Sequence, residues 1–133
     1  MLGVDTNVLI RFLTLDDESQ TPQAQQLLAK PANHPIYISM LVLAEAFNVM
    51  TKVKKFPATA VLDSYRSLLR SPALTIERFD MVAAAIEDAS RTNAGFSDAL
   101  IALQNAEAGC LTTATFDFKA TRLGGMSPVE SSL

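Results

Sequence analysis

Residues 36–45 read IYISMLVLAE, and within this stretch the sequence passes from a strand pattern to a helix pattern. The first three residues, Ile36 to Ile38, have the β-branched and aromatic side chains that are typical of a short strand. Ser39 follows at a position suited to a helix N-cap, and a helix is predicted after it from Met40 to Val53. A strand that leads directly into a helix is therefore the unit from which we expect this fold to be built.

The same alternation of strand and helix continues along the rest of the chain. Further short strands are predicted at residues 2–4, 74–76, 110–112 and 126–129. A helical turn is predicted at residues 8–13. A helix of about ten residues is predicted next, with an acidic start at residues 16–19, Pro22 in its first turn and residues 23–30 after it. Further helices are predicted at about residues 56–70, 80–92 and 98–107, the last capped by Ser97 or Asp98. No hairpin signal such as Asn-Gly joins two strands, which favours βαβ units over antiparallel pairs. The predicted fold class is α/β, a three-layer α/β/α sandwich in which helices cover both faces of a parallel sheet.

The length and the composition limit what the chain can be. With 133 residues it can form one compact domain with a hydrophobic core, so we expect a single domain over residues 1–133. Hydrophobic residues make up 49% of the chain, and part of that apolar surface is expected to meet a partner. The net charge of −3 has the wrong sign for binding nucleic acid through bulk charge, so any such binding must be local or metal-assisted.

The sequence also indicates a cellular location. Cys110 is the only cysteine, which excludes an internal disulfide framework and agrees with a reducing compartment. The first five residues carry no cationic start and end in Asp5, so they do not resemble a signal peptide. The longest apolar segment, residues 36–50, contains Glu45 and is too short to span a membrane. We therefore expect a cytoplasmic protein without a membrane anchor.

Four acidic residues stand at positions where an α/β sheet binds its ligands, beyond the carboxyl ends of the strands. Asp5 directly follows the first predicted strand, and Asp117 follows the fourth by a few residues. Asp98 lies at the start of a predicted helix. Glu45 lies on a mostly apolar helix face, where a carboxylate calls for a partner or a bound cation. These four acids are candidates for one shared site.

Each of these acids also has a simpler interpretation when it is taken alone. Asp5 and Asp98 are suited to be helix caps, and Asp117 is suited to cap a turn or a short helix. Glu45 is compatible with an exposed position at the edge of its helix.

Four short motifs in the chain resemble those of a known family. They are VDTNVL at residues 4–9, SMLVLAEAF at residues 39–47, DALIA at residues 98–102 and TFD at residues 115–117. Together and in this order they are similar to the acidic motifs of PIN-domain nucleases, and in particular of VapC-type toxins. Each motif is short, but the set of four spans nearly the whole chain and is specific.

The resemblance implies a site and a set of partners. Asp5, Glu45, Asp98 and Asp117 align with the catalytic, metal-binding acids of the family. Thr6 and Asn7 match polar residues that support the site, and we place Thr115 beside Asp117 in the same supporting role. At this last motif the family often has a further acid or Asn, and this chain has threonine and phenylalanine instead. The resemblance also implies a five-stranded parallel sheet, homodimers and a small antitoxin protein that blocks the site.

The predicted activity is that of an endoribonuclease that needs Mg²⁺ or Mn²⁺ and serves as the toxin of a toxin–antitoxin pair. Both ions prefer hard oxygen ligands, and four converging carboxylates would repel one another without a cation. Asp5 and Asp98 are expected to bind the metal directly, Glu45 to bind it or to orient a water, and Asp117 to act at a second ion or through water. By resemblance, the RNA products carry 5′-phosphate and 3′-hydroxyl ends.

Basic residues are the candidates for contacts with RNA phosphates. They are Arg11, Lys52, Lys54, Lys55 and Lys119. For the three clustered lysines, the alternative is an ordinary solvated helix end.

Other classes of protein fit the sequence less well. A haloacid-dehalogenase-like phosphatase would have a second aspartate at the position of Asn7, and a receiver domain would have adjacent acids after its first strand, where Asp5 stands alone. No GxxxxGK phosphate loop is present. The alternative that remains is a non-catalytic PIN-like or receiver-like binding module.

Overall fold

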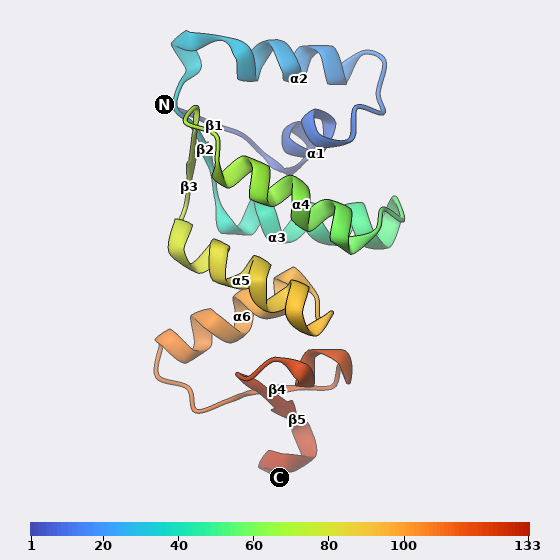
Figure 1. The fold of residues 1–133 in the computed structure, drawn as a ribbon, viewed down its shortest axis with the longest axis vertical. Helices are drawn as coiled ribbons and strands as arrows, with labels where there is room; N and C mark the ends of the chain where they lie inside the picture. The colour runs from blue at the N-terminus through green and yellow to red at the C-terminus, as the bar shows by residue number, and fades with distance from the viewer. The chain divides into compact units, whose positions relative to one another are not determined.

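A computed structural model describes residues 1–133, and the chain divides into two compact units, Met1–Phe79 and Asp80–Leu133 (Figure 1). None of the helices is both long and apolar enough to span a membrane.

The first unit contains a three-stranded parallel sheet. Its strands are β1 (Leu2–Gly3), β2 (Ile36–Ile38) and β3 (Leu74–Ile76), in the order β1-β2-β3. Ile36 pairs with Leu2 on one side and with Leu74 on the other. The side chains of Ile36 and Ile38 are 0% and 1% exposed, as expected for the central strand of a covered sheet. The strands predicted at residues 36–38 and 74–76 are confirmed.

Four helices belong to the first unit. They are α1 (Thr6–Thr14), α2 (Gln20–Ala29), α3 (Met40–Asn48) and α4 (Ala58–Leu69), with a short 3-10 turn, η1 (Pro31–Asn33), after α2. The predicted helix of residues 40–53 is confirmed up to Asn48, and its last part is a π-helical turn, η2 (Val49–Val53). The predicted helix of about ten residues with Pro22 in its first turn is confirmed as Gln20–Ala29, and at its acidic start the Asp17 carboxylate accepts hydrogen bonds from the backbone N–H groups of Ser19 and Gln20.

Tyr65 of α4 packs α4 against α3. Its ring is 1% exposed and meets the Phe47 ring edge-on, with 6.5 Å between the centroids. The hydroxyl donates a hydrogen bond to the Leu43 carbonyl oxygen at 2.6 Å. Burial raises the pKa of the Tyr65 hydroxyl well above its usual value, so it remains protonated and keeps donating.

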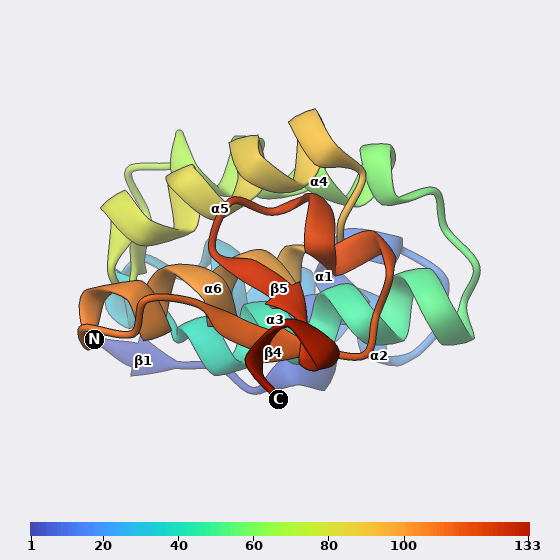
Figure 2. The same ribbon diagram turned by 90° about the horizontal axis from the view of Figure 1, so that it is seen from below.

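The second unit holds two helices and a pair of parallel strands. They are α5 (Phe79–Thr92), α6 (Phe96–Glu107), β4 (Thr113–Thr115) and β5 (Met126–Pro128), with the 3-10 turns η3 (Lys119–Arg122) and η4 (Val129–Ser132). Figure 2 shows β4 and β5 side by side, and their register pairs Thr113 with Met126. The chain passes from the end of α6 to β4 through Gly109, whose φ of +103° favours glycine.

Two predicted boundaries in the second unit are wrong. The strand predicted at residues 110–112 begins at Thr113 instead, because the Cys110 N–H still donates to the Asn105 carbonyl and closes the end of α6. Helix α6 begins at Phe96 and not at residue 98, since Gly95 takes the N-cap position. Asp98 therefore lies within the first turn of the helix.

The mixed α/β composition and the parallel pairing of every strand are confirmed. The single five-stranded sheet implied by the resemblance is not observed, since the strands pair as a group of three and a group of two. Each group includes a strand whose end leads to one of the predicted site acids, Asp5 after β1 and Asp117 after β4.

Candidate active site

Asp5 lies between β1 and α1 and is the N-cap of α1. Its Oδ1 atom accepts a hydrogen bond from the Val8 backbone N–H at 3.1 Å. The simpler interpretation as a helix cap is thus correct for this oxygen. The side chain is exposed, and its second oxygen accepts no hydrogen bond within the chain. Capping therefore orients the carboxylate and leaves one oxygen for an external ligand.

Thr6 joins the start of α1 to α3. Its hydroxyl donates a hydrogen bond to Oε2 of Glu45 at 2.8 Å, across 39 positions of the sequence. Glu45 is exposed, which agrees with the alternative of an edge position rather than with a carboxylate buried against the core. Because Thr6 follows Asp5 directly, this hydrogen bond brings Asp5 and Glu45 to the same corner of the first unit.

A pocket of about 270 Å³ lies between α1 and α2 and has Asp5 in its wall. The other lining residues are Asn7, Val8, Arg11, Gln20, Gln23, Ala24 and Leu27. Polar and charged side chains thus share this pocket with apolar ones.

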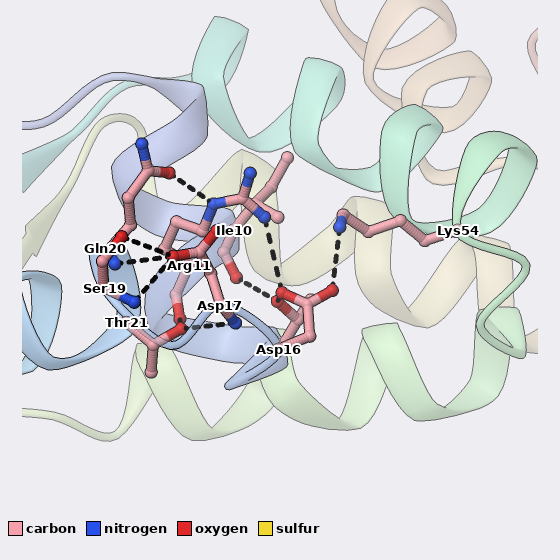
Figure 3. A network of polar contacts seen from close by, with 9 residues as sticks. Ile10, Arg11, Asp16, Asp17, Ser19, Gln20, Thr21 and Lys54 are labelled. Atoms are coloured by element: carbon pink, nitrogen blue, oxygen red, sulfur yellow. Dashed lines mark hydrogen bonds and ion pairs between the residues drawn. The ribbon is translucent and has the colours of Figure 1, made fainter.

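Asp16, which forms an ion pair with the pocket residue Arg11, belongs to a network of polar contacts (Figure 3). Its carboxylate forms ion pairs with Lys54 at 2.8 Å and with Arg11 at 3.4 Å, and it accepts a hydrogen bond from the Thr14 hydroxyl at 2.6 Å. The hydrogen bonds from Lys54 and then from Thr14 are the main causes that lower the pKa of Asp16 to about 2. Asp16 is therefore ionised at neutral pH.

The network fixes the orientation of the Arg11 side chain. Its Nε atom donates to Oε1 of Gln20 at 2.7 Å, while Nη1 faces Asp16. The backbone carbonyl of Arg11 accepts a hydrogen bond from the Thr21 hydroxyl at 3.1 Å. These contacts tie α1 to the start of α2 and hold the guanidinium at the pocket.

The basic residues predicted to meet phosphates differ in their surroundings. Lys54 is not a free solvated end, because it pairs with Asp16. Lys52, Lys55 and Lys119 are exposed, and Arg11 is the only cation that lines the pocket.

The two acids of the second unit have different environments. Asp98 is half-buried in the first turn of α6, and a Cβ added at Gly95 would come within 3.3 Å of its Oδ2 atom. Asp117 is exposed, and its Oδ1 atom accepts from the Lys119 N–H at 2.9 Å. The Asp117 N–H in turn donates to the Thr115 hydroxyl at 3.0 Å. As its simpler interpretation predicted, Asp117 caps the turn that leads to η3.

The carboxylate oxygens of Asp5 and Glu45 in the first unit are the type of ligand atom that a hard divalent cation prefers. Asp5 and Glu45 each use one carboxylate oxygen for a hydrogen bond within the chain. Mg²⁺ is commonly held by one or two carboxylates and completes its shell with water. Neither unit by itself gathers three or more Asp, Glu, His or Cys side chains that could hold a metal ion. A site that joins all four acids stays a prediction, because the two pairs belong to different units.

Sequence reasoning missed Gln20, Gln23 and the role of Asp16. The glutamines were detectable, because Gln20, Gln23, Ala24 and Leu27 follow the i, i+3, i+4, i+7 spacing of one helix face. Asp16 gave no such signal, since its partner Lys54 is 38 positions away.

The chain matches the PIN domain family over residues 3–125 and belongs to this family. The match covers both units and all four predicted acids. PIN domains are generally nucleases and typically use divalent metal ions. No curated protein matches the chain.

Proposed function

We propose that this protein is a metal-dependent endoribonuclease that hydrolyses RNA phosphodiester bonds, and that it is the VapC-type toxin of a toxin–antitoxin pair. The observation that carries the proposal is the corner formed by Asp5, Thr6 and Glu45 in a chain of the PIN family. The proposed active form is one domain over residues 1–133, a three-layer α/β/α sandwich that unites Asp5, Glu45, Asp98 and Asp117.

The proposed roles follow from the way each carboxylate is held. Asp5 and Asp98 would bind Mg²⁺ or Mn²⁺ directly, and Glu45 would bind the ion or orient the attacking water. The Thr6 hydroxyl donates a hydrogen bond to one oxygen of Glu45. This contact fixes the orientation in which the other oxygen can bind the ion or accept a hydrogen bond from the water. Asp117 is held only by its own turn and is assigned a water-bridged role, with Asn7 and Thr115 supporting the site.

The bound ion supplies stabilisation of the negative charge at the phosphate that is cut. The chain supplies position: two hydrogen bonds, from Val8 to Asp5 and from Thr6 to Glu45, orient these two carboxylates. A site whose donors are already oriented loses little free energy to reorganisation when substrate arrives.

The proposed partners are RNA, a second copy of the chain and a small antitoxin protein, and the proposed location is the cytoplasm. Exposed apolar side chains support a protein partner. The side chains with the largest exposed fractions are those of Leu111, Phe116, Phe118 and Leu133. Burying such apolar surface against a partner would stabilise the complex.

The test is cleavage of single-stranded RNA by the purified protein with Mg²⁺, with Mn²⁺ and with EDTA. We expect cleavage with either ion, none in EDTA, and none from Asp5→Asn. Asparagine is as good an N-cap as aspartate, so this variant keeps α1 and removes only the charge. Asp63→Asn, at an exposed acid of α4, is the matched control and should cleave like the wild type. Equal cleavage in EDTA would refute the proposal, and RNA binding without cleavage would favour the binding module.

A further inference from the structure

We propose that the pocket between α1 and α2 is a subsite for one nucleotide of single-stranded RNA, with Arg11 as the ligand of its phosphate. The inference rests on the proposed function, because it takes RNA as the substrate and Asp5 as part of the reaction centre. It adds a binding site next to the bond that is cut.

The size and the lining of the pocket suit one nucleotide. Its volume of about 270 Å³ lies just below the ~300–1,000 Å³ of typical pockets for small molecules, so it accommodates a single unit of an extended strand and not a duplex. Val8, Ala24 and Leu27 supply apolar surface for a base or a ribose.

Arg11 is the group in the pocket that attracts an anion. It is the only cation in the lining, and Asp5 is the only acid. The guanidinium is planar and always charged, and its fork of N–H groups matches the oxygens of a phosphate. Gln20 fixes Nε at 2.7 Å and Asp16 lies 3.4 Å from Nη1, which leaves Nη2 available to a ligand.

The acids near Arg11 do not cancel its charge, because other groups hold them more closely. Asp16 lies 2.8 Å from Lys54 and 3.4 Å from Arg11. Asp17 accepts hydrogen bonds from the backbone N–H groups of Ser19 and Gln20, at 3.0 and 2.7 Å. Asp16 thus acts as a positioning residue for Arg11, and its ion pair with Arg11 is longer than its ion pair with Lys54.

Two amide side chains complete the subsite. Asn7 and Gln23 line the pocket and are exposed, and their side chains make no hydrogen bond within the chain. Each amide offers two donors and an acceptor, which suits a base edge or the ribose 2′-hydroxyl.

The test measures RNA binding separately from cleavage. Binding of a short fluorescein-labelled single-stranded RNA is followed by anisotropy in EDTA, at several salt concentrations. We expect Arg11→Gln to weaken binding about tenfold, since it removes a charge-assisted contact. The slope of log K against log salt should fall by about 0.7, the value for one phosphate contact with a single strand. Arg66→Gln is the matched control, because Arg66 also pairs with an aspartate but lies outside the pocket, and it should bind like the wild type.

A second pair of variants tests the subsite even if Arg11→Gln does not fold. Gln23→Glu places a negative charge in the pocket, and Gln26→Glu places the same charge on an exposed position of the same helix outside it. Both change the net charge equally. We expect Gln23→Glu to weaken RNA binding severalfold more than Gln26→Glu.

The outcomes separate the two proposals. Wild-type binding by both Arg11→Gln and Gln23→Glu overturns the subsite, as does an equal loss in the control variants. A wild-type protein that binds no RNA in EDTA overturns it as well. If the wild type binds RNA in a way that depends on Arg11 and Gln23 but does not cleave with Mg²⁺, the subsite stands and the nuclease proposal fails.

Discussion

Two acids of the first unit, Glu45 and Asp16, have contacts with distant segments of the chain, whereas the exposed Asp117 of the second unit has only local ones. Glu45 is fixed by Thr6, 39 positions away, and Asp16 by Lys54, 38 positions away. Asp117 is held by Thr115 and Lys119, each two positions away. Contacts between distant segments exist only in the folded chain, whereas a two-residue turn can form in isolation. The position of Glu45 therefore depends on packing, and that of Asp117 on local sequence.

The largest effects should come from the acids themselves. Asp98→Asn, in the half-buried first turn of α6, is expected to lower RNA cleavage by roughly 100-fold or more, because it removes a proposed direct metal ligand. Asp117→Asn should lower cleavage less, since the exposed turn is assigned a water-bridged role. Initial rates at saturating Mg²⁺ give both values. A greater loss at Asp117 would reverse the assignment of roles.

The contrast between distant and local support can be measured with two threonines. Thr6→Val keeps the shape of the side chain and removes the donor to Glu45, so cleavage should fall about 10–100-fold. Thr115→Val removes the acceptor for the Asp117 N–H and should lower cleavage only slightly. Thr6→Ser restores the hydroxyl and should recover most of the activity. Equal losses from the two valine variants would show that the distant contact has no special role.

A smaller effect is expected at Gly95. A methyl group there would lie 3.3 Å from Oδ2 of Asp98, so Gly95→Ala should displace this carboxylate and lower cleavage severalfold. Gly124→Ala is the control, because a Cβ at Gly124 meets nothing within 4 Å. The comparison uses cleavage rates and the midpoint of thermal unfolding. Equal cleavage rates and equal unfolding midpoints for the two variants would show that the close approach of Gly95 to Asp98 does not affect activity.

The smallest effect is the pH dependence contributed by Asp16. The pKa of its carboxyl group is lowered from 3.8 to about 2 in the folded chain, so the group stabilises the fold at pH values above about 4. This contribution is lost as the pH falls from about 4 through 2. We expect urea unfolding to give the wild type a larger free energy of unfolding than Asp16→Asn at pH 6. This difference in free energy should vanish near pH 2. A constant difference would contradict the lowered pKa.

The elements that the sequence predicted best are those whose signals are local. The strand of residues 36–38, the Ser39 cap and the helix after it follow from neighbouring side chains, and they are observed in that order. Asp5 behaves as the cap that its position after β1 indicates, and it is also the acid around which the candidate site is built.

What the sequence did not predict depends on distant contacts or on backbone geometry. The division of the strands into two sheets depends on which strands pair, which no single segment specifies. The early start of α6 depends on Gly95, which takes the N-cap position without a side chain that could signal a cap. The Arg11 pocket requires α1 and α2 to pack side by side, so neither helix alone indicates it.

The buried Tyr65 gives the protein a spectroscopic label for one of its two units. The chain has two tyrosines and no tryptophan, and both tyrosines, Tyr37 and Tyr65, lie in Met1–Phe79. Tyrosine fluorescence therefore follows the unfolding of the first unit alone, while a thiol-reactive dye on the exposed Cys110 follows the second. Coincident transitions from the two probes would mean that the units unfold as a single cooperative body, and separate transitions would give each unit its own stability.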